Sequence, residues 1–259
     1  MTILQAVALF VAALLAGALN AVAGGGSLIS FPTLLFVGVP SISANATNKV
    51  ALWPGLFASA SAYRRELLQQ RRSVVLLSVV SLAGGLSGAL LLLATPERTF
   101  DQLVPYLLLT ATLLFTFSKP LTNRVLAYAE QSQGEQSKLA AVGAPLLQFL
   151  VSVYGGFFGA GLGIMILAVL AVVGMEDIHM MNALKTVLAG LVGSLAVITF
   201  IFAGIVVWPM ALTMIGGAII GGYAGGAIAR RFDARVIRRF VALVGFSVTL
   251  VVFVRQYML

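Results

Sequence analysis

The sequence predicts an all-α polytopic membrane protein. Hydrophobic residues make up 60% of the 259 residues and charged residues only 9%, whereas about 25% of the residues in a typical soluble domain are charged. Apolar runs of about twenty residues recur along the chain, and each can cross roughly 30 Å of hydrocarbon as a helix. The runs are continuous rather than alternating, which favours helices over the strands of a membrane barrel.

Composition also restricts the chemistry. The chain has no cysteine, so disulfides, thiolate metal sites and cysteine nucleophiles are excluded. One histidine, His179, leaves little for a metal site or a catalytic triad, and we expect no cofactor and no metal. The net charge of +8 lies in short loops between apolar segments, which fits the cytoplasmic bias of membrane proteins better than nucleic-acid binding.

The first apolar segment, residues 2–23, ends in Ala-Val-Ala and could be mistaken for a secretory signal. It lacks a basic stretch before its apolar run, and the glycine run that follows has a counterpart later in the chain. We therefore interpret it as part of the mature fold, with cleavage as the alternative.

Basic residues predict the orientation, because basic loops stay on the cytoplasmic side of the membrane. Two clusters are strongest: Arg64, Arg65, Arg71 and Arg72, then Arg230, Arg231, Arg235, Arg238 and Arg239. The polar stretch Lys119–Lys138 has mixed charge and is expected inside too. The sequence thus predicts a multi-pass membrane protein with these basic segments on the cytoplasmic side.

Six full spans are expected between these anchors. They are placed at residues 44–62, 73–94, 103–120, 182–204, 206–228 and 236–257, with an external loop at Glu97–Asp101. Two glycine-broken segments remain, residues 2–37 and 139–174. For the basic clusters to share one side, each of these must enter and leave on the same face. We expect two helical hairpins, one from each side.

The chain matches itself at an offset of 137 residues without a gap. Gly24 then matches Gly161, Gly26 matches Gly163, Asn45 matches Asn182, Ala46 matches Ala183 and Val50 matches Val187. Coincidence among small residues is the alternative, which the ungapped spacing and the shared hairpin-then-spans order disfavour. We expect a first repeat at residues 1–125, a cytoplasmic linker at 126–138 and a second repeat at 139–259. Each repeat makes three crossings, so the two would be inverted, as in many secondary transporters.

Two lysines are expected well inside spans, Lys49 and Lys185. A lysine at a helix centre costs roughly 2.5–3.5 kcal/mol on insertion scales, so each needs a reason. One helix face carries Asn45, Asn48 and Lys49, and the corresponding face in the second half carries Asn182, Lys185 and Thr186, because spacings of three and four residues stack on one side. Snorkelling to the lipid headgroups is the alternative for each lysine alone.

These faces predict an anion site. Both are expected in the first turns of a helix, where free N–H groups and the dipole favour negative charge. Glycine breaks let the backbone approach a ligand, and no acidic residue lies in these segments to neutralise the lysines. The full candidate set is Gly24, Gly25, Gly26, Asn45, Thr47, Asn48, Lys49, Trp53, Gln148, Gly161, Gly163, Asn182, Lys185 and Thr186.

Other polar and aromatic residues have weaker roles. Trp53 and Phe57 follow Lys49 at steps of four and could form an aromatic surface, although Pro54 could spoil the register. Core packing is the commoner fate of such aromatics. Glu176, Asp177 and His179 are expected at a cytoplasmic turn as solvated residues rather than a proton relay. The glycines Gly216, Gly217, Gly221, Gly222, Gly225 and Gly226 are expected to serve helix packing.

The texts GGGSLISFPTLL, Gly-Val-Pro and SANATNKV, followed in the second half by GFFGAGLG, resemble the sulfite exporter TauE/SafE family, also called the 4-toluene sulfonate uptake permease family. The resemblance covers nearly the whole chain and implies transport of sulfur oxyanions or organosulfonates, with some members exporting sulfite and others importing sulfonates. The second copy departs from the pattern, since Leu162 interrupts its glycine run and no proline matches Pro32.

The expectation is therefore a secondary transporter that moves an organosulfonate or sulfite by alternating access, with Lys49 and Lys185 as anchors. Membrane lipid is an expected partner, and a coupling proton or ion is left open. No nucleotide-binding loop occurs in the sequence. The alternatives are an anion channel, export of sulfite rather than import of sulfonates, an intramembrane enzyme and a structural membrane subunit; the enzyme is disfavoured because no embedded acid pair or activated nucleophile is visible.

Overall fold

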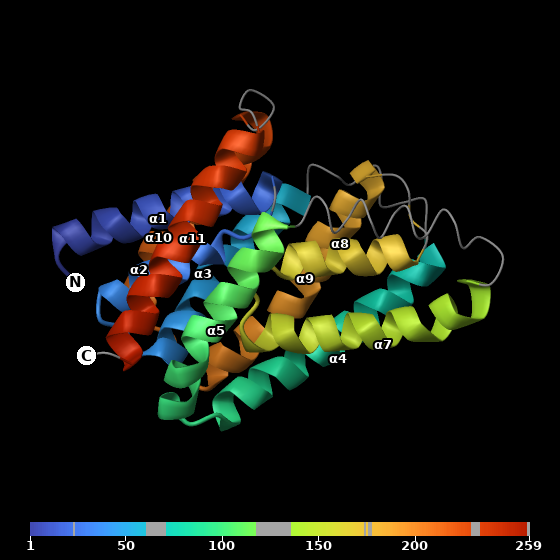
Figure 1. The fold of residues 1–259 in the computed structure, drawn as a ribbon, viewed down its shortest axis with the longest axis horizontal. Coiled ribbons are helices and arrows are strands. Elements are labelled where there is room, and N and C mark those ends of the chain that lie inside the picture. Colours follow the sequence, from blue (N-terminus) through green and yellow to red (C-terminus); the bar gives the residue numbers. More distant parts are fainter. Residues whose placement is uncertain are drawn as a thin grey trace.

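The computed structural model describes residues 1–22, 24–60, 71–117, 136–173, 175, 178–228 and 234–257, and the regular elements in these ranges are all α-helices (Figure 1). The helices are α1 Ile3–Val22, α2 Ser27–Phe36, α3 Ser41–Ala60, α4 Arg71–Ala94, α5 Glu97–Thr116, α7 Gln136–Phe157, α8 Leu162–Val172, α9 Ile178–Phe202, α10 Trp208–Ile228 and α11 Ala234–Tyr257. The all-α prediction is confirmed.

Within the described ranges, four helical segments are long and apolar enough to cross a membrane. They are Ile3–Ala21, Val75–Ala94, Glu97–Thr116 and Met180–Phe202. Shorter apolar segments occur at Ser27–Phe36, Gly143–Phe157, Leu162–Val172 and Val241–Tyr257. Large apolar side chains are exposed along the outer helices, including Val79 on α4 and Leu250 on α11, as lipid-facing surfaces require.

Both predicted glycine breaks are present. Helix α1 ends at Val22 and α2 begins at Ser27, and between them Gly24 and Gly25 have φ values of 67° and 126°. Helix α7 ends at Phe157 and α8 begins at Leu162, with Gly159 and Gly161 at φ values of 88° and 79°. Only glycine adopts such left-handed backbone without strain, so the glycines permit the chain to leave each helix and re-enter another.

The expected external loop at Glu97–Asp101 is wrong. These residues form the first turns of α5, which begins directly after Pro96 in an extended conformation. The side chain of Phe100 is fully buried, so this turn belongs to the packed helix, and the connection between α4 and α5 shrinks to residues 95–96. The other five predicted spans agree with the helices within a few residues.

The expected position of the lysines in first helical turns is also wrong. Helices α3 and α9 begin at Ser41 and Ile178, three and four residues before the predicted spans. Lys49 is the ninth residue of α3 and Lys185 is the eighth of α9. Their neighbouring N–H groups are therefore inside the helical ladder rather than free.

Parts of the predicted topology fall outside the described residues. These are Arg64, Arg65, Arg230, Arg231, Glu176, Asp177 and most of the linker. Of the expected linker at 126–138, residues 136–138 belong to α7 instead. His179 is the second residue of α9.

Helix α1 packs along α10, and α7 packs along α4, in the two most extensive helix pairs (Figure 1). Helix α3 contacts α10, and α9 contacts α4, while α3 and α9 meet each other. The outer helices α5 and α11 form a further pair. Helices α3 and α9 therefore lie between the two extensive pairs.

Glycines allow the closest of these contacts. A Cβ atom at Gly221 of α10 would lie 1.9 Å from the Leu14 carbonyl oxygen of α1, and one at Gly88 of α4 would lie 2.0 Å from the Val153 carbonyl oxygen of α7. The same backbone contact occurs at Gly217 and Gly225 of α10. The predicted packing role is confirmed for these α10 glycines, which bring helix backbones together without intervening side chains.

Replacing Gly221 by alanine is expected to destabilise the protein by about 1–3 kcal/mol, since the added methyl group would overpack against backbone. The matched control is Gly143→Ala on α7, where no atom lies within 4 Å of the new Cβ. The control should be neutral or slightly stabilising, by up to about 1 kcal/mol, because alanine favours helix. Thermal unfolding of the detergent-solubilised variants measures both, and equal unfolding temperatures would contradict the packing role.

Candidate functional site

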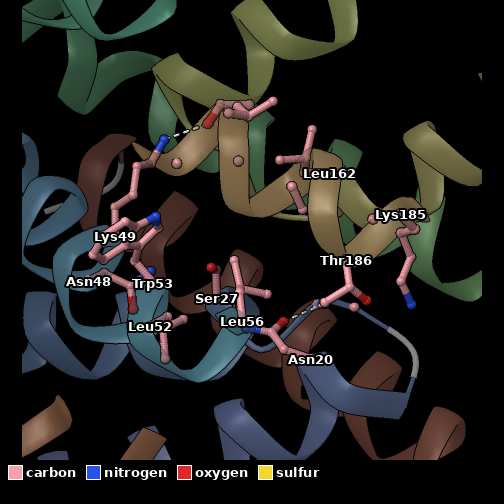
Figure 2. Close-up of a pocket in the computed structure, with 18 of the residues that line it drawn as sticks. Asn20, Ser27, Asn48, Lys49, Leu52, Trp53, Leu56, Leu162, Lys185 and Thr186 are labelled. Atoms are coloured by element: carbon pink, nitrogen blue, oxygen red, sulfur yellow. Dashed lines mark hydrogen bonds between the residues drawn. The ribbon is translucent and has the colours of Figure 1, made fainter. Parts of the chain in front are cut away.

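The two helix breaks and helices α3 and α9 surround a cavity of about 90 Å³ (Figure 2). Its wall consists of Asn20, Gly24, Gly25, Ser27, Asn48, Lys49, Leu52, Trp53, Leu56, Gly155, Phe158, Gly159, Leu162, Gly163, Lys185, Thr186, Ala189, Val192 and Gly193. The cavity therefore draws on both halves of the chain. Figure 2 shows Lys49, Asn48, Leu52 and Trp53 on one helix, with Lys185 and Thr186 on another.

The breaks meet each other at this cavity. A Cβ at Gly24 would lie 3.5 Å from the Gly163 Cα, so the backbones are almost in contact. Ser27, the first residue of α2, and Leu162 and Gly163, the first residues of α8, all line the cavity. The N-cap residues Gly26 and Gly161 carry no side chain that could cap these helices. The positive dipole ends of two short helices thus border the same space.

Asn20 holds the first break in shape. Its Oδ1 accepts hydrogen bonds from the backbone N–H groups of Gly25 and Gly26, at 3.2 and 2.9 Å. This residue also lines the cavity and is not among the candidates predicted from the sequence. Its signal was available, because Asn20 is a polar residue in an apolar segment just before the glycine run.

Lys185 lies along the second break. Its side chain is only 4% exposed, and its Cδ would lie 3.3 Å from a Cβ at Gly163. The ammonium group donates to Asn182 Oδ1 at 3.0 Å, while Thr186 Oγ1 donates to the Asn182 carbonyl at 2.9 Å. Asn182 therefore orients both cavity residues without lining the cavity itself.

The ammonium group of Lys49 donates hydrogen bonds to the carbonyls at the end of α7. Its Nζ donates to the Gly155 carbonyl and, at 2.7 Å, to the Gly156 carbonyl. One turn earlier on α3, Asn45 Nδ2 donates to the Phe157 carbonyl at 2.7 Å. These are the last three residues of α7, whose carbonyls have no partner within their own helix. Two α3 side chains therefore cap the helix that ends at the second break.

Trp53 keeps the register expected for the cavity despite Pro54. Its Nε1 donates to the Gly190 carbonyl and to Ser194 Oγ on α9, at 3.1 and 3.3 Å, while the ring lines the cavity. Phe158 of the second break supplies another aromatic wall. The side chain of Phe57 lies outside the described part of the structure.

The candidate residues thus divide into two groups. The cavity brings together Gly24, Gly25, Asn48, Lys49, Trp53, Gly163, Lys185 and Thr186. Gly26, Asn45, Thr47, Gln148, Gly161 and Asn182 are not part of its wall among the described residues. Thr47 Oγ1 accepts from the Val207 N–H at 3.0 Å, and Gln148 Nε2 donates to Ser81 Oγ and Ser152 Oγ between α4 and α7.

The electrostatics of the cavity favour negative charge. Two lysines and two helix N-termini border it, and no Asp or Glu occurs among the described residues that line it. Most of the remaining wall is glycine or apolar side chain. A site partly shielded from solvent strengthens each charge interaction relative to water, so the arrangement can hold a small anion.

Broken half-helices that meet at a charged cavity inside an apolar helical bundle are typical of membrane transporters. The comparisons with known proteins agree with this class. The chain belongs to the sulfite exporter TauE/SafE family, whose model matches residues 9–252.

The curated relatives are named as transporters. A probable membrane transporter protein ORF9 from Sinorhizobium sp. is 30% identical over 247 residues, which cover 93% of this chain and 90% of the relative. A probable membrane transporter protein from Haemophilus influenzae is 27% identical, and the match covers 93% of this chain and 91% of the relative. The probable membrane transporter protein YfcA from Escherichia coli is 26% identical, and the match covers 91% of this chain and 85% of the relative. No solved structure matches the chain significantly.

Proposed function

We propose that this protein is a secondary transporter that moves a small sulfur-containing anion, an organosulfonate or sulfite, across the bacterial inner membrane by alternating access. The observation that carries the proposal is the cavity bordered by Lys49, Lys185 and the N-termini of α2 and α8. Cations would be repelled by such a wall. An anionic headgroup could instead meet the ammonium of Lys185 and the positive ends of both short helices.

Alternating access would operate between two inverted repeats, residues 1–125 and 139–259, joined by the linker at 126–138. The helix contacts support this division. If α1, α3 and α4 correspond to α7, α9 and α10, the pair α1–α10 corresponds to α7–α4, and the pair α3–α10 corresponds to α9–α4. Both pairs of contacts are present, which supports a two-fold relation between the halves.

Individual residues support the same relation. Gly84 and Gly88 of α4 match Gly221 and Gly225 of α10 at the offset of 137 residues, and all four pack against the first helix of the opposite half. Trp53 donates to the Gly190 carbonyl across the α3–α9 contact, and these two positions are themselves 137 residues apart. Equivalent positions that touch each other lie on the axis of a two-fold relation.

Uptake by the purified protein in proteoliposomes tests the function. Radiolabelled sulfite or taurine should enter at a rate that saturates with concentration, because each cycle carries one bound anion. An anion channel would instead give sustained single-channel conductance without saturation. Imposed proton and sodium gradients, applied separately, would identify the coupling ion, and loading the vesicles would distinguish export of sulfite from import of sulfonates.

A thermal-shift screen of the solubilised protein narrows the substrate. The panel is sulfite, sulfate, thiosulfate, taurine, sulfoacetate and toluenesulfonate, and at least one is expected to raise the unfolding temperature through preferential binding to the folded state. A structural membrane subunit would respond to none of them. That outcome, together with absent uptake, would contradict the proposed function.

A further inference from the structure

Asn48 carries an unpaired acceptor in the cavity wall. Its side chain is only 3% exposed, and Oδ1 has no hydrogen-bond partner. Among the described residues, Gln148 Oε1 is the other buried side-chain atom in this situation, and Gln148 does not line the cavity. Asn48 is therefore the described cavity residue whose buried polar atom lacks a partner.

Three other polar residues of the cavity wall already have hydrogen-bond partners. Asn20 Oδ1 accepts two backbone N–H groups, Lys49 donates to two carbonyls, and Trp53 Nε1 donates to α9. The bonding partners of these three side chains are backbone groups and the Ser194 hydroxyl, not Asn48. Buried acceptors are normally paired, so an unpaired one in a binding cavity indicates a donor that arrives with the ligand.

We propose that Asn48 Oδ1 accepts a hydrogen bond from the transported molecule, and that the substrate is therefore a compact anion that also carries an O–H or N–H donor. This inference rests on the proposed anion transport. Hydroxyalkanesulfonates, aminoalkanesulfonates and hydrogen sulfite belong to this class, whereas sulfate, fully ionised sulfite and unsubstituted alkanesulfonates do not. Lys185 and the helix N-termini would bind the anionic group, while Asn48 Oδ1 accepts a hydrogen bond from the O–H or N–H group of the same molecule.

An isosteric ligand pair tests the proposal. 2-Hydroxyethanesulfonate and propane-1-sulfonate have the same charge and nearly the same size, but only the first carries a donor. The wild-type protein should bind the hydroxy compound about 5- to 150-fold more tightly, because the methyl compound would leave the buried acceptor unpaired. Competition against labelled anion uptake, or calorimetry on the solubilised protein, gives the ratio of dissociation constants.

Variants assign the effect to Asn48. Asn48→Leu keeps similar volume and removes the acceptor, so the preference for the hydroxy compound should fall to about one or below, since the methyl compound is the more apolar ligand. The matched control is Gln102→Leu on α5. The Gln102 side chain is exposed and does not line the cavity, so this variant should keep the wild-type ratio.

Each outcome has one meaning. Equal affinity of the wild-type protein for the two compounds would show that water satisfies Asn48 and would overturn the inference, while anion transport itself would stand. If Asn48→Leu still prefers the hydroxy compound, the ligand donates to a residue other than Asn48, and the inference is wrong. Failure to bind either sulfonate or sulfite would count against the proposed function rather than against Asn48. Because the wild-type ratio needs no variant, the test survives even if Asn48→Leu fails to fold.

Discussion

Replacing Lys185 by methionine is expected to weaken anion binding by about 2–5 kcal/mol, or roughly 30- to 5000-fold, which is the usual cost of removing one partner of a buried, hydrogen-bonded charge pair. Methionine keeps the unbranched apolar stem that lies over Gly163 and removes the ammonium group, together with its hydrogen bond to Asn182. Calorimetric affinity for the best anion of the screen and its uptake into proteoliposomes measure the effect.

The control for this prediction is Arg239→Met. Arg239 is exposed on α11 and lies outside the cavity wall, so its loss changes the net charge by the same amount without removing a ligand contact. Anion affinity should stay at the wild-type level in this variant. Wild-type affinity in Lys185→Met, with an unchanged unfolding temperature, would exclude Lys185 as the anchor.

Replacing Lys49 by methionine is expected to lower the free energy of unfolding. Without the ammonium, the buried carbonyls of Gly155 and Gly156 lose their donor, and each unsatisfied buried acceptor costs about 1–3 kcal/mol. The end of α7 would loosen together with the second break. A lower unfolding temperature and a loss of uptake should appear together.

The variant Lys49→Arg tests whether the stability lost in Lys49→Met comes from the missing hydrogen bonds to the end of α7. The guanidinium carries five donors and keeps the positive charge, so it should recover part of the stability lost in Lys49→Met. Saturating anion should not restore Lys49→Met to the wild-type unfolding temperature, because the missing contact is to the protein backbone. A methionine variant as stable as the wild type would contradict the capping role.

The sequence predicted the helical breaks and the central lysines because both depend on local chemistry. Glycine permits the left-handed turns at residues 24 and 161, and a lysine within an apolar segment needs a special environment wherever it folds. The helix starts were missed because they depend on distant residues. Glu97 Oε1 accepts from Ser41 Oγ and the Ile42 N–H, so the carboxylate of one helix caps the start of another.

The partners of Lys49 could not be predicted for a related reason. They are backbone carbonyls more than 100 residues away in the chain. Every residue has such a carbonyl, so no sequence motif marks the ones that Lys49 contacts. Thr47 shows the same limit, because its hydroxyl accepts from the backbone of Val207. The internal match predicts which positions of the two halves correspond, but only the folded chain assigns Asn45 and Lys49 to the end of α7.

The glycine-mediated contacts restrict how this molecule can move. At Gly221 and Gly88, a carbonyl of the neighbouring helix lies directly against the glycine Cα. If one helix slid or rotated past the other, a residue with a side chain would replace the glycine at this contact and clash with the backbone. Helix α1 should therefore travel with α10, and α7 with α4, as two rigid bodies. Gly85 of α4 meets the Val192 carbonyl of α9 in the same way, and Gly55 of α3 meets the Ala218 carbonyl of α10, so each central helix should move with its own pair. Relative displacement then falls on the contact between α3 and α9, the helices that carry the two lysines.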